Sequence, residues 1–159
     1  MEIRIISVGK IKEKYLNDAI AEYTKRLSRY CKLQFLQVPD EKTPDHASAL
    51  QNQMIKETEG LRLLKQIRDQ DYVIALAIEG EMPDSVELSG KIRQLGVQGK
   101  STIDFVIGGS LGLSPEVLKR ADEKISFSRL TFPHQLMQVI LLEQIYRSFR
   151  IMKNEPYHK

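Results

Sequence analysis

A glycine-rich segment with the sequence GGSLG, at residues 108–112, is the part of the chain best suited to chemistry. It follows an apolar run at residues 102–107 that is typical of a buried strand, and glycines at such a point let a ligand approach the backbone closely. The segment also matches the pattern G-x-S-x-G, in which Ser110 would be the nucleophile of a serine hydrolase. That nucleophile lies on the strand-to-helix turn itself, whereas the helix-starting residues Ser114 and Pro115 come later. A ligand-binding loop is therefore the favoured interpretation.

Two further segments follow apolar runs in the same way. Gly80 comes after the run at residues 71–78, and the sequence SFSRLTFP, at residues 126–133, continues from a short apolar run at residues 125–127. In open α/β sheets, ligands bind outside the carboxyl ends of the strands. We therefore expect the three segments to form one pocket of backbone groups and apolar walls. Such a pocket suits a flat aromatic ring with polar edges, for example adenine.

The C-terminal tail is another candidate for chemistry. Arg147 and Arg150 belong to a basic stretch that leads to the sequence NEPYHK at residues 154–159. A basic helix end is usually a solvated surface with a favourable dipole contact. His158 differs from it, because histidine is the side chain that most often accepts a proton near neutral pH. The tail is therefore a candidate for acting on a substrate, with Tyr157 able to orient His158.

The spacing of other residues disfavours several kinds of site. The first strand-to-helix turn has a single glycine, Gly9, where a dinucleotide-binding fingerprint needs three. The sequence GKS at residues 99–101 lacks the leading glycine of a phosphate-binding loop and enters a strand rather than a helix. The chain has 3 histidines and 1 cysteine, Cys31, without metal-ligand spacing. We therefore expect no metal and no intrachain disulfide.

The elements that must position these residues alternate along the whole chain. Strand-like runs are expected at residues 2–8, 33–38, 71–78, 102–107 and 125–127. Helical spacing is expected at residues 12–30, 47–68, 84–95 and 134–152, with a further helix start at Ser114 and a turn at residues 80–83. This alternation predicts an α/β fold with a mostly parallel sheet and helices on both faces.

Size and composition limit the classes of function. The chain has 159 residues, so we expect one domain over residues 1–159. Its 24 lysines and arginines against 21 acidic residues give a net charge of +3, which permits RNA as a partner without requiring it. The single cysteine fits a reducing cytoplasm, and neither a signal peptide nor an apolar run of roughly 18 residues is present. We therefore expect a cytoplasmic protein without a membrane segment.

Four motifs, taken in order, resemble those of a known family. They are L-x-I-x-G at residues 76–80, FVIGGS at residues 105–110, SFS-x-LTFPH at residues 126–134 and EQIYR at residues 143–147. Each motif is weak alone, but in this order and at this chain length they are specific. Over its whole length the sequence is similar to the RlmH family, the small SPOUT-superfamily methyltransferases that act on large-subunit ribosomal RNA.

The resemblance implies more than the residue patterns do. It implies a C-terminal trefoil knot, a homodimer, and S-adenosylmethionine as methyl donor for N3 of a pseudouridine in large-subunit (23S) ribosomal RNA on the ribosome. It also implies a cofactor site that consists of Leu76, Gly108, Phe127, Ser128, Arg129, Leu130, Thr131 and Phe132. The RNA contacts expected with it are Arg147, Arg150 and Lys159.

Alternatives to this interpretation remain open at the level of sequence. The chain could be a serine hydrolase that uses Ser110, or a ribosome-binding module without catalytic activity. Within the methyltransferase hypothesis, His158 could accept the proton of the imide nitrogen, or the tail could only shield the pocket or contact RNA. The methyltransferase is favoured because three predicted cofactor segments have no role in a binding module.

Overall fold

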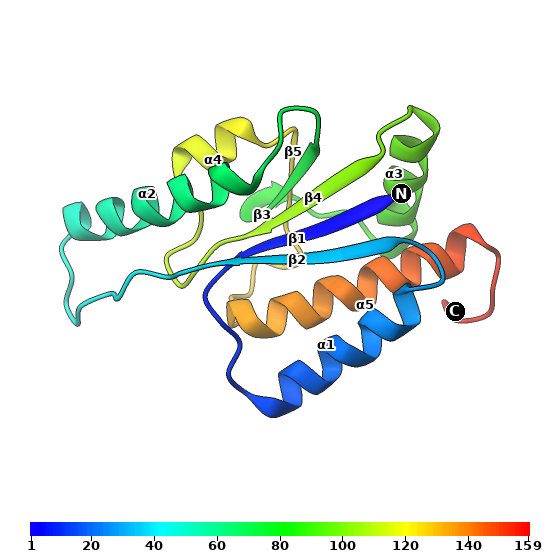
Figure 1. Cartoon of the computed structure of the whole chain (residues 1–159), viewed down its shortest axis with the longest axis horizontal. Helices are drawn as coiled ribbons and strands as arrows, with labels where there is room; N and C mark the ends of the chain where they lie inside the picture. The colour runs from blue at the N-terminus through cyan, green and yellow to red at the C-terminus, as the bar shows by residue number, and fades with distance from the viewer.

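The computed structural model describes residues 1–159 as one five-stranded sheet with five helices (Figure 1). The strands are β1 (Glu2–Val8), β2 (Lys32–Val38), β3 (Tyr72–Glu81), β4 (Thr102–Ile107) and β5 (Glu123–Ile125). The helices are α1 (Lys14–Leu27), α2 (Ala49–Gln66), α3 (Ser85–Val97), α4 (Pro115–Arg120) and α5 (His134–Met152). None of these helices is both long and apolar enough to cross a lipid bilayer.

All five strands run parallel, in the order β2-β1-β4-β3-β5. The sequence prediction of an α/β fold with a mostly parallel sheet is therefore confirmed. Because the strands are parallel, their carboxyl ends meet at one edge of the sheet, and the segments that follow β3, β4 and β5 leave from neighbouring positions.

Side-chain alternation along β1 divides the core between the two faces of the sheet. Ile3 and Ile5 pack in a buried cluster with residues of α1, α3 and α5. Ile6 and Val8 pack in a second cluster with residues of α2 and α4. Figure 1 shows α1 and α5 on one side of the sheet and α2 and α4 on the other, so the prediction of helices on both faces is also confirmed.

Short polar side chains begin three of the helices. Ser48 and Gln51 form a reciprocal capping box at the start of α2, and Asp84 and Glu87 form another at the start of α3. The predicted cap Ser114 accepts a hydrogen bond from the backbone of the first turn of α4, with proline at the next position.

Several boundaries shift by one to three residues from the sequence prediction, and the shifts of β3 and β5 bear on the site. β3 extends through Gly80 and Glu81, where a turn was expected, and β5 occupies residues 123–125 instead of residues 125–127. The reason is a close approach between distant segments. A Cβ atom at Gly80 would lie 2.7 Å from the backbone nitrogen of Ile125, and the backbone of Ser126 donates to the carbonyl of Glu81 at 2.7 Å. Glycine therefore lets β3 continue past β5 instead of ending there.

A buried charged cluster joins three strands at the opposite edge of the sheet. Arg4 of β1 forms ion pairs with Asp71, just before β3, and with Asp104 of β4, the latter at 3.4 Å. Its guanidinium also donates to the carbonyl of Gln66 at the end of α2, at 2.6 Å. Both carboxylates are fully buried, and Oδ1 of Asp104 has no hydrogen-bond partner. The cluster ties strands together away from the predicted pocket.

Candidate functional site

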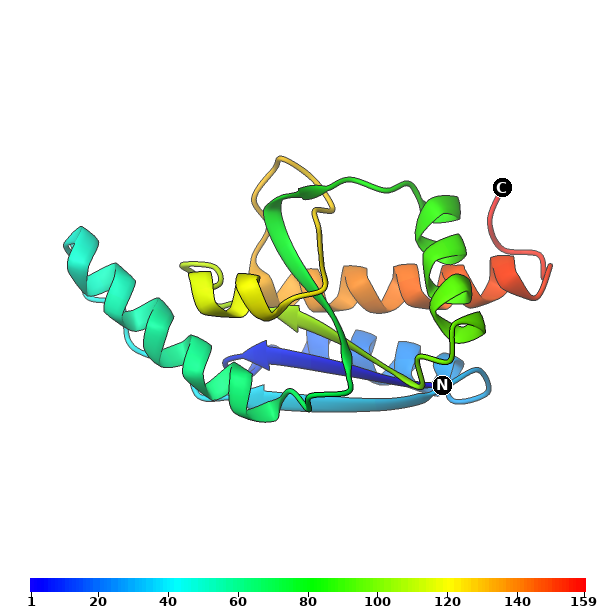
Figure 2. The ribbon, with the colours of Figure 1, turned by 90° about the horizontal axis from the view of Figure 1, so that it is seen from above.

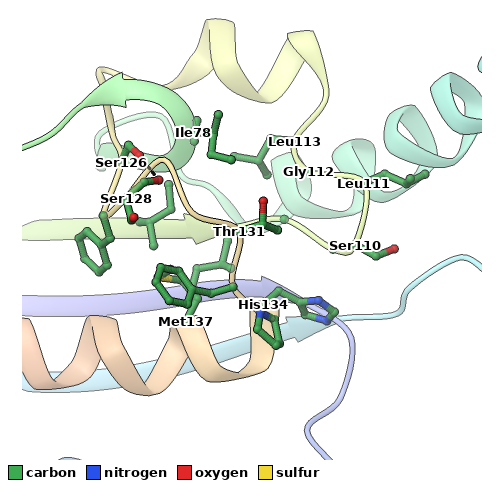
Figure 3. Close-up of a pocket in the computed structure, with 18 of the residues that line it drawn as sticks. Ile78, Ser110, Leu111, Gly112, Leu113, Ser126, Ser128, Thr131, His134 and Met137 are labelled. Carbon is green, nitrogen blue, oxygen red and sulfur yellow. Dashed lines mark hydrogen bonds between the residues drawn. The ribbon is translucent and has the colours of Figure 1, made fainter.

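A cavity of about 810 Å³ lies at the carboxyl edge of the sheet, where the segments after three neighbouring strands meet (Figure 3). Its walls consist of the second half of β3, the glycine loop (residues 108–112), residues 126–133 and the first turn of α5. The volume falls within the range of roughly 300–1,000 Å³ that is typical of small-molecule sites. Of the 24 lining residues, 12 are hydrophobic, so the cavity suits a ligand that carries both an apolar ring and polar groups.

Residues 126–133 form an irregular wall that two serines hold in shape. The hydroxyl of Ser126 donates to the carbonyl of Ser128 at 3.0 Å, and the hydroxyl of Ser128 accepts from the backbone N–H of Leu130 at 2.9 Å. Figure 3 shows these serines on one side of the cavity. Because the segment forms no sheet or helix ladder, its other backbone groups can bind a ligand.

The glycine loop turns tightly back on itself after β4. The backbone N–H of Gly112 donates to the carbonyl of Gly109 at 3.0 Å, and Gly112 has a φ of 87°, which favours glycine. A Cβ atom at Gly108 would lie 2.7 Å from the carbonyl carbon of Gly112. Glycine at position 108 is therefore required for the closed shape of the loop.

Helix α2 supports the glycine loop from behind. Glu59 is only 5% exposed; its carboxylate accepts from the backbone N–H of Glu41 at 3.0 Å and lies 3.1 Å from where a Cβ of Gly109 would be. Burial raises the pKa of Glu59, and the hydrogen bond from Glu41 acts in the opposite direction. A Cβ at Gly60 would lie 2.3 Å from the hydroxyl oxygen of Ser114. Sequence reasoning missed this support; its one signal is a glycine inside a helix.

His134 is a further cavity residue that sequence reasoning did not assign to the site. It is the first residue of α5, and Figure 3 shows it near Met137, below Thr131 and Ser110. Burial lowers the pKa of its imidazole, while the nearby carboxylates of Asp40 and Glu13 act in the opposite direction.

The structure brings most of the predicted cofactor residues together. The cavity is lined by Leu76, Gly108, Phe127, Ser128, Leu130, Thr131 and Phe132. Arg129 is exposed and does not line the cavity, because the chain at this point directs its side chain outward. Gly80 does not line it either; that expectation is wrong because Gly80 lies within β3, against β5.

Ser110 lies in the glycine loop as predicted, but nothing around it resembles a hydrolytic triad. Ser110 is exposed, and its hydroxyl has no hydrogen bond to His134, which is the only histidine that lines the cavity. The helix that follows begins only at Pro115, so the serine does not lie on a strand-to-helix elbow. The geometry therefore favours a ligand-binding loop over a nucleophile.

The C-terminal tail lies on α5, far from the cavity of its own chain. The hydroxyl of Tyr157 donates to the carboxylate of Glu143 at 3.0 Å, and the ring of His158 lies 3.1 Å from the guanidinium of Arg147. Arg147 is 13 residues after His134 on the same helix, which corresponds to about 20 Å at a rise of 1.5 Å per residue. Figure 2 shows the C-terminus near the end of α5, away from its first turn.

The predicted RNA contacts in this region have partners within the chain. Arg147 pairs with Glu143 at 2.7 Å, and Arg150 pairs with Glu155. Burial and the hydrogen bond to Glu143 both raise the pKa of the Tyr157 phenol, to about 12. Of the three predicted RNA contacts, only Lys159 is exposed and free of an ion pair. Arg147 and Arg150 therefore hold the tail against α5.

Comparisons with known proteins agree with this architecture. The model of one protein family, described as "Predicted SPOUT methyltransferase", matches residues 1–158. The chain is 61% identical to the "Ribosomal RNA large subunit methyltransferase H" of Clostridium kluyveri and 62% identical to the protein of that name from Bifidobacterium adolescentis. Both alignments cover 100% of each chain.

Solved structures with low sequence identity share the fold. A probable methylase family protein from Haemophilus influenzae has a TM-score of 0.56 at 16% identity, over 99% of this chain and 70% of that one. A probable methyltransferase from Bordetella pertussis has a TM-score of 0.58 at 14% identity, over 92% of this chain and 95% of that one. With the family match and the full-length relatives, these findings show that the chain belongs to the SPOUT methyltransferases and, within them, to the RlmH family.

Proposed function

We propose that the protein transfers a methyl group from S-adenosylmethionine to N3 of a pseudouridine in large-subunit ribosomal RNA. The observation that carries this proposal is the cavity at the carboxyl edge of the sheet, in a chain of this methyltransferase family. Full-length relatives named for large-subunit ribosomal RNA support the substrate class. The single-domain organisation over residues 1–159 and a trefoil knot in the C-terminal part of the chain belong to the same proposal.

The residues that line the cavity fit S-adenosylmethionine. The tight glycine loop lines the cavity and offers backbone groups to a ligand, and glycine at position 108 lets the loop close on itself in this shape. Leu76, Phe127 and Phe132 supply apolar surface for an adenine ring, and residues 126–133 supply backbone donors and acceptors for its polar edge. When bound, the cofactor supplies an electrophilic methyl group on a positively charged sulfur.

The RNA must reach the same cavity with its target base turned toward the methyl group. Holding both reactants in line can contribute several kcal/mol to the rate, provided that the nitrogen loses its proton. A net charge of +3 on one chain is small for gripping a large RNA alone. Two chains together double the basic surface, which supports a homodimer.

A homodimer also gives the tail a role. Within one chain the tail lies about 20 Å along α5 from the first turn that lines the cavity. In the proposed dimer, Tyr157, His158 and Lys159 of one chain contact the RNA at the cavity of the other. Exposure of His158 and Lys159 is compatible with such a contact.

Two measurements test the proposed function. Calorimetry should detect S-adenosylmethionine binding to the purified protein. Incubation with ribosomes and radiolabelled cofactor should then place label in large-subunit RNA, and mass spectrometry should locate it on one pseudouridine. Reaction of Ser110 with a covalent serine probe, without cofactor binding, would favour the hydrolase. RNA binding without cofactor affinity would favour the non-catalytic module.

A further inference from the structure

His134 is the only one of the three histidines that lines the cavity. Its ring is half-buried, and neither ring nitrogen forms a hydrogen bond within the chain. Neither ring nitrogen is among the fully buried polar atoms that lack a partner, so both remain open to the cavity and available to a ligand that enters it. The fold maintains this availability, because His134 begins a 19-residue helix that packs along the core.

The surroundings of His134 favour a neutral ring. Nε2 lies 3.7 Å from the position that a Cβ of Gly9 would occupy, and the Cβ of Asp40 lies 3.9 Å from the same position. The charged groups that face the ring are Asp40, from the loop after β2, and Glu13, before α1. Lys56 of α2 lines the same cavity. Burial outweighs both carboxylates and lowers the pKa of His134, so at neutral pH the ring keeps a lone pair that can accept a proton.

We propose that His134 is the catalytic residue that accepts the N3 proton of the target base. This inference rests on the proposed function and concerns how the same cavity performs it. The imide nitrogen carries a proton that must leave before or during methyl transfer. A ring nitrogen of His134 takes the proton, the electron pair of the N–H bond remains on N3, and N3 forms the bond to the methyl carbon. The bond between that carbon and sulfur breaks, and its electrons remain on sulfur, so S-adenosylhomocysteine leaves as a neutral thioether.

The tail histidine is less suited to this role in the conformation observed. An arginine guanidinium can only donate hydrogen bonds, so the contact with Arg147 at 3.1 Å occupies the lone pair on Nδ1 of His158. The proton of the neutral ring is then on Nε2, which leaves no free lone pair to accept another. His158 fits an RNA contact, while His134 keeps both ring nitrogens free of protein partners.

The test compares His134→Asn with a matched control, His46→Asn. His46 is an exposed histidine outside the cavity, and its φ of 55° is one that asparagine tolerates. Single-turnover methyl transfer to ribosomes is measured with enzyme and cofactor in excess, between pH 6 and pH 9. We expect His134→Asn to lower the rate by roughly 10²–10⁴-fold at pH 7, with S-adenosylmethionine affinity within about threefold of the wild type. The control should keep the wild-type rate.

The pH profile distinguishes a proton acceptor from a structural residue. Without its acceptor, the His134→Asn variant depends on spontaneous ionisation of the imide, so its rate should rise roughly tenfold per pH unit. The wild-type rate should stay level down to the lowered pKa of His134. A rate within threefold of the wild type, a flat profile, or a parallel loss of cofactor affinity would each overturn the assignment. His158→Asn should not produce the rising profile; if it does and His134→Asn does not, the tail histidine is the acceptor.

A readout independent of turnover keeps the proposal testable if the variant fails to fold. The ring signals of His134 in the wild-type protein can be followed by NMR, and they should titrate below the usual range for histidine. A pseudouridine-containing RNA hairpin, at a concentration at which other signals of the protein show that it binds, should shift them, and unchanged His134 signals in the bound protein would overturn the proposal. Wild-type protein that neither binds S-adenosylmethionine nor labels ribosomes would contradict the proposed function itself. An active wild type with an unaffected His134→Asn variant would contradict only the role of His134.

Discussion

At the scale of single residues, Gly108 has the strongest structural constraint in the cavity. A Cβ at this position would lie 2.7 Å from the carbonyl carbon and 2.8 Å from the carbonyl oxygen of Gly112. Real Cβ atoms do not approach backbone so closely, so even alanine must open the glycine loop. The constraint comes from the backbone of the loop itself and does not depend on whether a ligand is bound.

We therefore predict that Gly108→Ala weakens S-adenosylmethionine binding at least about tenfold, which corresponds to about 1.4 kcal/mol. The opened loop can no longer present its backbone groups in the same positions. Gly90→Ala is the matched control, because Gly90 is exposed on α3 and a Cβ there would meet nothing within 4 Å. Calorimetry on both variants checks the prediction. Equal affinity of Gly108→Ala and the wild type would show that the glycine loop is not part of the cofactor site.

At the scale of elements, the buried cluster around Arg4 predicts how stability depends on pH. Burial raises the pKa of Asp104 to about 7, although Arg4 acts in the opposite direction. Hydrogen bonds from Arg68 lower the pKa of Asp71, although burial opposes this change. The two buried carboxylates thus differ, with Asp71 as the ionised partner of Arg4 and Asp104 as the one that keeps its proton more readily.

The raised pKa fixes the sign of the contribution of Asp104. The pKa of Asp104 is about 7 in the folded state and 3.8 as its ordinary value, so between these pH values the folded state binds a proton that the unfolded state has released. This proton stabilises the fold fully below about pH 3.8, and the stabilisation is lost as pH rises through about 7. Asp104→Asn removes this titration. Only the wild type loses this stabilisation as pH rises. The free energy of unfolding of Asp104→Asn minus that of the wild type should therefore increase from pH 4 to pH 8.

Asp71→Asn should instead lower the free energy of unfolding by roughly 3–5 kcal/mol, because it leaves Arg4 without its ionised partner.

Chemical denaturation of the wild type and both variants at several pH values measures these differences. A relative stability of Asp104→Asn that does not change with pH would show that Asp104 has an ordinary pKa in the folded state.

The elements themselves were largely predictable from local patterns. β1 and β4 were predicted with their observed bounds, because their apolar runs end at clear polar or glycine signals. α5 was also predicted with its observed bounds, because Pro133 precedes it and apolar residues recur at helical spacing. The end of β3 was not predictable, since Gly80 and Glu81 belong to the strand only through pairing with β5, more than 40 residues later.

The candidate site was predicted where it depends on strand ends and missed where it depends on other elements. The glycine loop and residues 126–133 follow strands directly, so the rule about carboxyl edges placed them together. Glu59 reaches the site from α2, and no spacing rule relates a helix residue to a distant loop. His134 directly follows residues 126–133, but its sequence position alone did not show that its ring lines the cavity. The partners of Arg147 and Arg150 were also missed, because whether a basic residue is free or paired depends on where the tail folds.

At the scale of the whole molecule, the tail should matter for RNA methylation far more than for folding. Tyr157 packs edge-on against Tyr146 at 5.0 Å between ring centroids, which contributes about 1 kcal/mol. Deletion of residues 157–159 should therefore lower the melting temperature by only about 2–4 °C. Glu155 remains bonded to Arg150 and Tyr30 in this variant and keeps the rest of the tail in place.

We predict that this deletion leaves S-adenosylmethionine affinity nearly intact and lowers methyl transfer at least about tenfold. Calorimetry and single-turnover assays on ribosomes measure the two quantities. Lys159→Ala is the companion variant, and a defect that disappears at low salt would identify Lys159 as a phosphate contact. Full activity of the deletion variant on ribosomes would exclude a role for the tail.

Mixed dimers test whether the tail serves the partner chain. A tail-deleted chain has an intact cavity, and a Gly108→Ala chain has an intact tail. If the tail acts across the dimer, mixing the two weakened variants should restore activity at one of the two cavities. If the tail acts on its own chain, the mixture should be no more active than the two variants measured separately.

The most direct measurement of the central claim is transfer of a labelled methyl group by the purified protein. Ribosomes from cells that lack this gene are incubated with the protein and radiolabelled S-adenosylmethionine, and the RNA is then digested and examined by mass spectrometry. The account predicts label in large-subunit RNA, on N3 of one pseudouridine, in the wild type, and at least about tenfold less label in Gly108→Ala at a cofactor concentration below the wild-type Kd. Protein that binds no S-adenosylmethionine, or that leaves ribosomal RNA unlabelled under conditions where it is folded, would contradict the account.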